Sequence, residues 1–67
     1  MNAADLARFQ AVLALDPVDM ARDLSIPEAR LMDLLREIEA PSEEEVRQIE
    51  EGCLREYGVT PTTLERT

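Results

Sequence analysis

The chain contains no histidine, lysine or tryptophan, and it has a single cysteine, Cys53. Without histidine or lysine, a nucleophilic side chain has no neighbouring base to activate it. The neighbouring carboxylates of Glu43-Glu44 and Glu50-Glu51 point about 100° apart on a helix, so they do not converge on a substrate. Cys53 cannot form an internal disulfide, and its place on an apolar stripe favours a buried thiol. We therefore expect a protein that is not an enzyme.

Sequence motifs for cofactors and metals are also missing. Gly52 and Gly58 are the two glycines of the chain, so there is no glycine run that could cradle a phosphate. Neither the spacing of a zinc site nor that of a calcium loop occurs. We expect no cofactor and no metal.

Aromatic residues and long apolar runs are scarce. Phe9 and Tyr57 are the only aromatic side chains, so a core must consist of aliphatic residues, which suit packed helices better than a sheet. No run approaches the roughly 18–20 apolar residues of a membrane span, and the N-terminus lacks the layout of a signal peptide. These absences predict one all-α domain over residues 1–67, located in the cytosol.

Most of the charged residues in the chain are acidic. Fifteen acidic residues stand against seven arginines, which gives a net charge of −8. Residues 37–56 alone sum to −6, and this segment predicts an acidic surface that comprises Glu39, Glu43, Glu44, Glu50 and Glu51. Such a field repels nucleic acid and anionic membranes, and it favours a protein partner with a basic surface. The alternative is that the charge only keeps a small protein soluble.

Helical periodicity predicts two helices in the first part of the chain. The first starts after the cap Asn2 and reaches about Leu15, with apolar positions at Leu6, Phe9 and Leu13. Asp16 and Pro17 then restart the chain as the N-cap and first residue of a second helix, over about 17–24. The inward residues of this second helix are Met20, Ala21 and Leu24.

Further helices follow the turn at 25–26. Pro27 opens a third helix, which ends at Ala40-Pro41 and has an apolar stripe of Leu31, Leu34, Leu35 and Ile38. Ser42 and Glu45 form a capping box for a fourth helix that reaches about Tyr57, with Gly58 as its C-cap. Its apolar face comprises Val46, Ile49, Cys53, Leu54 and Tyr57. A last short turn runs from Thr60-Pro61 through Leu64, so the expected unit is compact and has four or five helices.

The second and third helices have the spacing of a helix-turn-helix. With Pro17 as the first position of the motif, Ala21 falls where only a small side chain lets the two helices cross closely. Ser25 falls in the turn, and the packing positions that follow hold Ile26, Leu31 and Leu34. Over about residues 3–64 the chain resembles the lambda repressor/Cro-like helix-turn-helix family.

This resemblance implies that the third helix reads the major groove of DNA, through the side chains that are here Glu28, Ala29, Met32 and Asp33. Phosphate contacts would come from Pro17, Arg36 and the 39–43 stretch. The chain departs from this pattern, because groove reading relies on Arg, Lys, Asn or Gln, and of these only Arg36 lies nearby. Carboxylates in the 39–43 stretch would repel phosphate.

We therefore expect a small regulatory module on a repressor-like scaffold that acts by protein contact, as an antirepressor, a phage-type inhibitor or an adaptor would. The expected partner-binding residues are Glu28, Ala29, Met32, Asp33 and Arg36. The alternative is a double-stranded-DNA-binding repressor of the Cro type, which the nearly neutral 17–36 segment keeps open through Arg22, Arg30 and Arg36. A structural subunit of a larger assembly is a third hypothesis. The sequence also allows a weak homodimer through the fourth helix or the 59–64 tail.

Replacing Ala21 with Leu tests the predicted helix crossing. The larger side chain should overpack the crossing and destabilise the domain by about 1–3 kcal/mol. A domain of this size has a net stability of only roughly 3–5 kcal/mol, so the variant should be largely unfolded near its former melting temperature. Thermal denaturation followed by circular dichroism measures the effect. An unchanged melting curve would mean that the two helices do not cross at Ala21.

Overall fold

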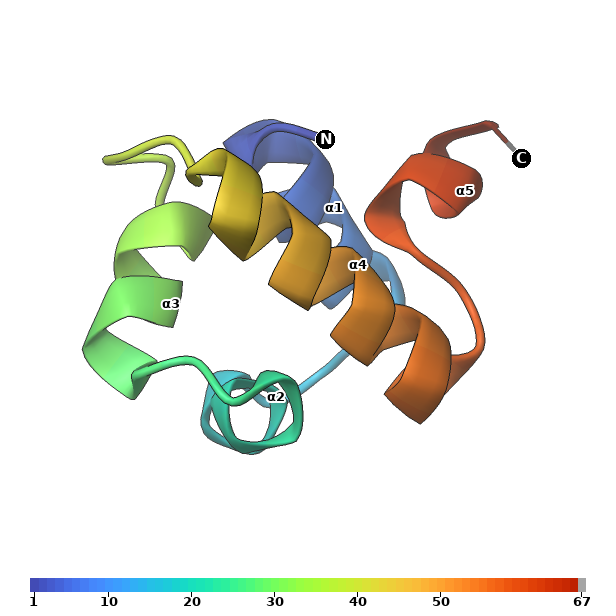
Figure 1. Cartoon of the computed structure of the whole chain (residues 1–67), viewed down its shortest axis with the longest axis horizontal. Coiled ribbons are helices and arrows are strands. Elements are labelled where there is room, and N and C mark those ends of the chain that lie inside the picture. The colour runs from blue at the N-terminus through green and yellow to red at the C-terminus, as the bar shows by residue number, and fades with distance from the viewer. Residues whose placement is uncertain (67) are drawn as a thin grey trace.

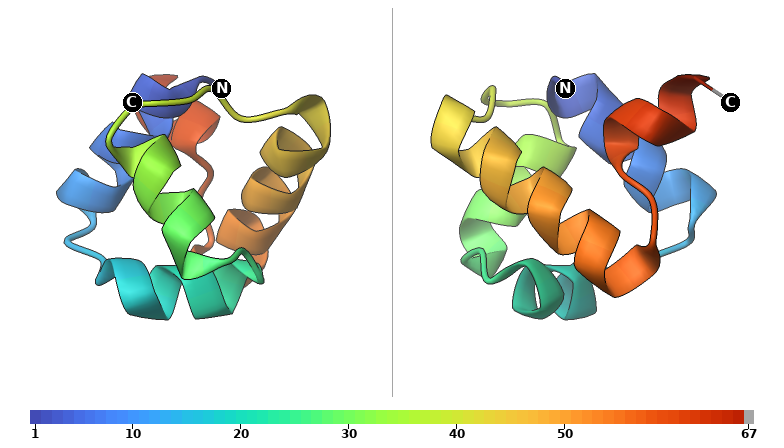
Figure 2. Two further views of the ribbon diagram at one scale, coloured as in Figure 1. Left: turned by 90° about the vertical axis from the view of Figure 1, so that its left-hand side faces the viewer. Right: turned by 45° about the vertical axis from the view of Figure 1, so that its right-hand side comes forward.

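Five helices and no strand occur over residues 1–66 of the computed structural model, which describes side chains through residue 64. The helices are α1 (Ala3–Val12), α2 (Pro17–Leu24), α3 (Glu28–Leu35), α4 (Glu43–Tyr57) and α5 (Pro61–Arg66). α1 packs against α3 and α5, while α2 packs against α3 and α4. α2 lies crosswise at the end of α3, as the left view of Figure 2 shows (Figures 1 and 2). The resulting globule measures 28 × 22 × 19 Å and confirms the all-α fold class.

The core between these helices is almost entirely aliphatic. Its fully buried side chains include Leu6, Phe9, Met20, Leu24, Leu31, Leu34, Ile49 and Cys53. The ring of Phe9 lies 6.0 Å from that of the partly buried Tyr57, measured between centroids. The core includes most of the residues that the periodicity assigned to the inner faces of the helices, with Ile49 and Cys53 from α4 among them.

The predicted helix starts are confirmed at α1, α2 and α4. The Asn2 side chain accepts a hydrogen bond from the Asp5 N–H at 2.9 Å, and Asp16 accepts one from the Val18 N–H at 2.8 Å. At α4, the Ser42 hydroxyl accepts a hydrogen bond from the Glu45 N–H, and the Glu45 carboxylate accepts one from the Ser42 N–H. α3 begins one residue later than predicted, because Pro27 occupies the cap position and has no side chain that could cap.

The ends of α1, α2 and α3 share an uncommon feature. Ala14, Ser25 and Glu37 adopt left-handed backbone conformations, with φ of 52°, 58° and 59°. The next N–H in each case bonds back to the carbonyl five residues earlier, in pairs Leu15–Gln10, Ile26–Ala21 and Ile38–Asp33 at 2.9–3.0 Å. This is the Schellman motif, which usually has glycine in the left-handed position. Only α4 ends on the expected glycine, Gly58, with φ of 78°.

These left-handed ends correct two predictions. α1 ends at Val12 rather than Leu15, because the backbone turns at the left-handed residue Ala14. α3 likewise ends at Leu35 rather than Ala40, because the backbone turns at Glu37. Ile38 thereby leaves the predicted stripe of the third helix and is 64% exposed. Leu13, expected on the buried face of the first helix, is 36% exposed.

α4 approaches α2 closely, and only a few residues of α4 are buried. A Cβ at Gly52 would lie 2.6 Å from Leu24 Cδ2, so the absence of a side chain permits the contact. Ile49, Gly52 and Cys53 are buried, whereas Leu54 was expected on the apolar face and is 60% exposed. The other two residues of the predicted stripe, Val46 and Tyr57, are half-buried.

α5 closes the open side of α1. Pro61 is fully buried, and Thr62 Oγ1 donates a hydrogen bond to Glu50 Oε1 at 2.8 Å, which ties α5 to α4. The predicted last turn is therefore a short helix. Within residues 1–66, no helix has the length and apolar character that crossing a bilayer requires.

Replacing Glu37 with Gly should stabilise the domain. A non-glycine residue in the left-handed region costs about 1–2 kcal/mol, of which the greater entropy of unfolded glycine offsets a part, so a net gain of about 0.5–1 kcal/mol is expected. Urea denaturation measures the change. The matched control is Glu51→Gly, which removes the same charge inside α4 and should destabilise by about 1 kcal/mol. A loss of stability in Glu37→Gly would contradict the left-handed end of α3.

Candidate functional site

The outer surface of α3 carries the five residues predicted to bind a partner. Leu31 and Leu34 face the core and are fully buried. On the opposite side of the helix, Glu28, Ala29 and Arg36 are exposed. Met32 and Asp33 lie between them and are half-buried. All five predicted residues therefore share one side of α3, which we call the α3 surface.

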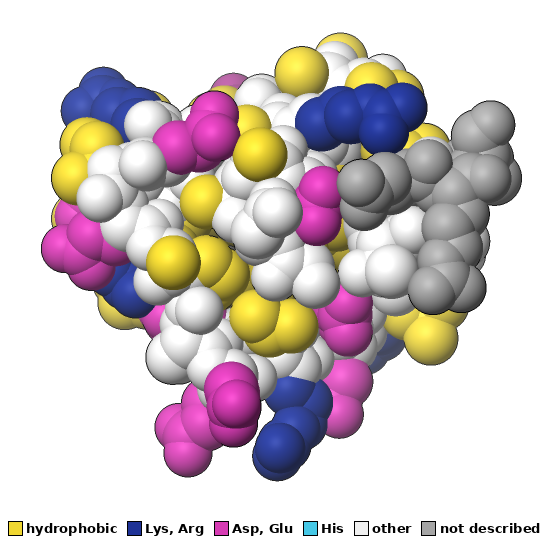
Figure 3. Space-filling model, turned by 90° about the horizontal axis from the view of Figure 1, so that it is seen from above, with side chains coloured by type: hydrophobic (Ala, Val, Ile, Leu, Met, Phe, Trp, Pro, Cys, Tyr) yellow, Lys and Arg dark blue, Asp and Glu magenta, His cyan; other side chains and the backbone are white. Residues whose placement is uncertain are grey.

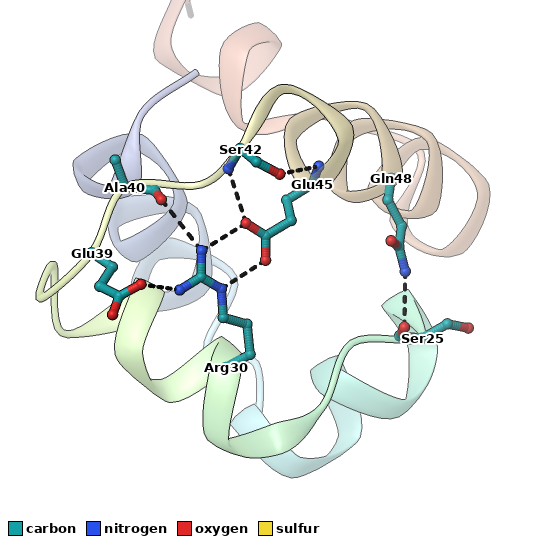
Figure 4. Close-up of polar contacts among 7 residues, drawn as sticks. All are labelled: Ser25, Arg30, Glu39, Ala40, Ser42, Glu45 and Gln48. Atoms are coloured by element: carbon teal, nitrogen blue, oxygen red, sulfur yellow. Dashed lines mark hydrogen bonds and ion pairs between the residues drawn. The ribbon is translucent and has the colours of Figure 1, made fainter.

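Arg30 does not belong to this surface, because its side chain points toward the loop and α4. Its Nε and Nη2 donate to the two carboxylate oxygens of Glu45, each at 2.7 Å, in a bidentate ion pair. Nη1 donates to Glu39, and Nη2 also approaches the Ala40 carbonyl at 3.4 Å (Figure 4). We call this group of Arg30, Glu39, Glu45 and the Ala40 carbonyl the Arg30 clamp. It joins α3 to α4 and holds the loop between them.

The Arg30 clamp and the α4 capping box share Glu45. The Glu45 carboxylate accepts the Ser42 N–H at 2.9 Å while it binds Arg30 (Figure 4). Hydrogen bonds from Arg30 and from the Ser42 backbone lower the pKa of Glu45 to about 2. Hydrogen bonds to Glu45 and to Glu39 raise the pKa of Arg30 above its usual range. Both members of the pair are thus charged at neutral pH, and the positive charge of Arg30 is matched within the chain.

A second polar contact fixes the turn between α2 and α3. Gln48 Nε2 donates to the carbonyl oxygen of Leu24 at 2.9 Å and to that of Ser25 at 2.8 Å; the bond to Ser25 is drawn in Figure 4. These carbonyls lie at the C-terminal end of α2, where backbone acceptors have no partner within the helix. Gln48 therefore anchors α4 to the turn that sets the direction of α3.

The remaining arginines near the α3 surface differ in their partners. Arg22 Nη2 pairs with Asp19 at 3.1 Å on the exposed side of α2. Arg36, at the end of α3, forms no ion pair with any residue whose side chain is described. On the face seen in Figure 3, the basic side chains stand apart from one another among acidic and apolar groups. No continuous basic stripe lies across that face.

The five residues of the predicted acidic surface do not form one functional group. Glu39 is part of the Arg30 clamp, and Glu50 is half-buried and accepts the hydrogen bond from Thr62. Glu43, Glu44 and Glu51 are exposed on α4. Of the five predicted carboxylates, these three form no hydrogen bond or ion pair with another described side chain.

The buried titratable groups at the other end of α4 have packing roles. Burial, and secondarily the charge of Glu50, raises the pKa of Cys53 to about 12, so its thiol is protonated at neutral pH. Tyr57 donates its hydroxyl to Asp23 Oδ2 at 3.0 Å, and burial followed by this bond raises its pKa. Over the described residues, neither a pocket nor a cluster of metal ligands is found.

The sequence reasoning missed the Arg30 clamp and the Gln48 contact. Arg30 was expected to be available at the surface, because its partner Glu45 lies fifteen residues away and no local pattern links the two. The capping box identified Glu45, but only the tertiary structure shows that its carboxylate has a second role.

Comparison of the chain with protein-family models, with curated proteins and with solved structures finds no match.

Replacing Glu45 with Gln tests the Arg30 clamp by its pH dependence. The folded-state pKa of Glu45 is about 2 against an ordinary value of 4.5, so its stabilising effect is complete above about pH 4.5. The effect is lost as the pH falls toward about 2. The variant should melt at a lower temperature at pH 7, and its stability should fall less steeply below pH 4.5 than that of the wild type.

Thermal melts from pH 7 to pH 2 measure both effects. Glu44→Gln removes the same charge one residue earlier, outside the Arg30 clamp, and serves as the matched control. Equal acid slopes for the wild type and Glu45→Gln would show that the pair does not contribute to stability.

Proposed function

We propose that this protein is a small, non-enzymatic regulatory module of the cytosol, built on a helix-turn-helix scaffold of the lambda repressor/Cro type. The arrangement of α2 and α3 supports the scaffold. Ala21 is buried where α2 meets α3, Ser25 has the left-handed turn conformation, and Ile26 is buried directly after it. Leu31 and Leu34, the other two packing positions, are fully buried. α1 precedes this pair and α4 follows it, as in the family.

The module acts by protein contact through the α3 surface rather than by reading DNA. At the positions that would face a major groove, it presents two carboxylates, Glu28 and Asp33, beside the small apolar group of Ala29 and Met32. Base reading depends mainly on side chains that donate hydrogen bonds, and Arg36 alone supplies them here.

The observation that carries the proposal is the Arg30 clamp. Arg30 is one of the three arginines that kept DNA binding open in the sequence, and here its guanidinium is bound by Glu39 and Glu45. Arg22 is likewise matched by Asp19. Because phosphate contacts supply much of the affinity for DNA, an interface left with Arg36 alone would bind weakly. A protein partner needs no such cations.

The α3 surface also defines the chemistry of the partner. An apolar centre of two side chains, Ala29 and Met32, has acidic groups and one arginine around it. Contacts of this kind concentrate their affinity in the apolar centre, while the charged rim sets the orientation and specificity. The partner should therefore offer a shallow apolar hollow bordered mainly by basic side chains.

Binding to DNA is tested by fluorescence anisotropy with labelled random and genomic duplexes at about 50 mM salt, where counterion release favours binding most. We expect no binding at submicromolar protein concentrations. Submicromolar, sequence-dependent binding would contradict the proposal and would establish a repressor of the Cro type.

Binding to a protein is tested with the double variant Met32→Ala/Asp33→Arg. The immobilised chain captures proteins from extract of its native cell, and the captured protein is then purified and titrated by calorimetry. Loss of the apolar centre and reversal of a rim charge should weaken binding by about tenfold or more. Thermal melts verify that the variant is folded.

The matched control is Leu54→Ala/Glu51→Arg, which makes the same kinds of change on the exposed side of α4. It should bind the partner like the wild type. If the control loses binding and the α3 variant does not, the acidic side of α4 is the binding surface and the proposal for α3 is wrong.

A further inference from the structure

The corner between α1 and α2 exposes the longest run of apolar side chains in the described structure. Ala11, Val12, Leu13 and Ala14 are consecutive and all exposed, with Val12 at 60%. Val18, which follows the short connection at the start of α2, is 53% exposed. Four consecutive exposed apolar residues are unusual on a soluble surface unless they serve an interaction.

The run owes its exposure to the left-handed end of α1. Ala14 reverses the chain directly after α1, and the Leu15 N–H bonds back to the Gln10 carbonyl at 3.0 Å. Gln10 Nε2 donates in turn to the Leu15 carbonyl at 2.7 Å, which fixes the turn from both sides. Leu15 packs on the core, whereas Leu13 is left outside. The apolar corner is therefore presented by a hydrogen-bonded backbone and would lose little entropy on binding.

The charges around this corner are balanced, unlike those of the chain as a whole. Residues 8–22 contain two arginines, Arg8 and Arg22, and two aspartates, Asp16 and Asp19, which cancel, whereas the whole chain has a net charge of −8. A second copy of so acidic a chain would meet strong repulsion at α4, but far less at this corner.

The order of the charges is also self-complementary. Arg8 lies one turn before Val12 on α1 and forms no ion pair with any described residue. Asp16 and Asp19 lie beyond the apolar run, at the start of α2. Asp19 pairs with Arg22, so Asp16 is the carboxylate of this end that forms no ion pair with a described side chain. When two copies pair about a two-fold axis through the apolar residues, the basic end of one copy meets the acidic end of the other.

We propose that the α1–α2 corner, formed by Arg8, the apolar run 11–14, Asp16, Val18 and Asp19, binds a second copy of this chain and forms a two-fold homodimer. This surface differs from the fourth helix and the 59–64 tail that the sequence allowed for a homodimer, where Ile49 and Cys53 of the apolar stripe are buried in the core. It shares no residue with the α3 surface, so the dimer does not depend on the function proposed for α3. A patch of this size is below that of a standard interface and predicts a weak dimer.

Sedimentation equilibrium of the full chain, from about 20 µM to 1 mM, measures the association. The average mass should rise toward that of a dimer at about 20 mM and at about 500 mM salt, because salt screens both the net repulsion and the attraction of Arg8 to the acidic end of the second copy. Amide shifts in concentration-dependent NMR spectra should change within residues 8–22. A protein that is monomeric at about 1 mM in both salts would overturn the proposal.

The variant Val12→Ser/Val18→Ser should raise the dimer dissociation constant by about tenfold or more, since both exposed side chains lie at the centre of the pairing. Arg8→Glu should also weaken the dimer, because the new carboxylate would lie opposite Asp16 and Asp19 of the second copy and repel them. The matched control Leu54→Ser alters a leucine that is exposed to the same extent, 60%, on α4. The control should leave the dissociation constant unchanged.

Thermal melts establish that each variant is folded. Dimerisation that survives Val12→Ser/Val18→Ser in the folded state, or that is lost in Leu54→Ser, would place the interface elsewhere and overturn the proposal.

Discussion

The ion pair between Arg30 and Glu45 is the interaction on which the relation between α3 and α4 depends. α3 packs on α1 and α2 through its apolar side, while the Arg30 clamp ties it to α4. The same Glu45 carboxylate completes the capping box at the start of α4, so one side chain serves a helix end and a helix pair. Removing either partner would leave a partly buried charge unmatched, which is more harmful than the loss of an exposed surface pair.

This pair also supports the proposal that the chain acts by protein contact rather than by binding DNA. An arginine that is held by two carboxylates of its own chain would have to break those bonds before it could reach a phosphate. The α3 surface keeps one arginine without an ion pair, Arg36, next to two carboxylates. A scaffold that resembles a DNA reader can therefore present a surface suited to proteins, because the packing positions and the reading positions of α3 are independent of each other.

The left-handed ends of three helices decide which apolar side chains remain outside the core. Ala14, Ser25 and Glu37 each occupy a conformation that glycine adopts more easily, and the strain is held by the hydrogen bonds of the Schellman motif. In so small a domain this strain is a substantial fraction of the net stability. If the α1–α2 corner pairs two copies, each dimer presents two α3 surfaces, and a partner with two sites would bind it with an increased effective concentration.

The sequence by itself determined the helical class, the caps of α1, α2 and α4, and most of the inner residues of the first three helices, with Leu13 and Ile38 as the exceptions. Periodicity and capping chemistry act within one or two helical turns, so Asn2, Asp16 and the Ser42–Glu45 box were readable without a structure. The five residues predicted to bind a partner lie on one side of α3, as the helical period of the sequence indicates. The tertiary structure alone decided where α1 and α3 stop, since no glycine marks their ends, and that Leu54 stays outside while Gly52 meets Leu24. It alone showed the bond between Arg30 and Glu45, because side chains fifteen residues apart on two helices meet only after the chain has folded.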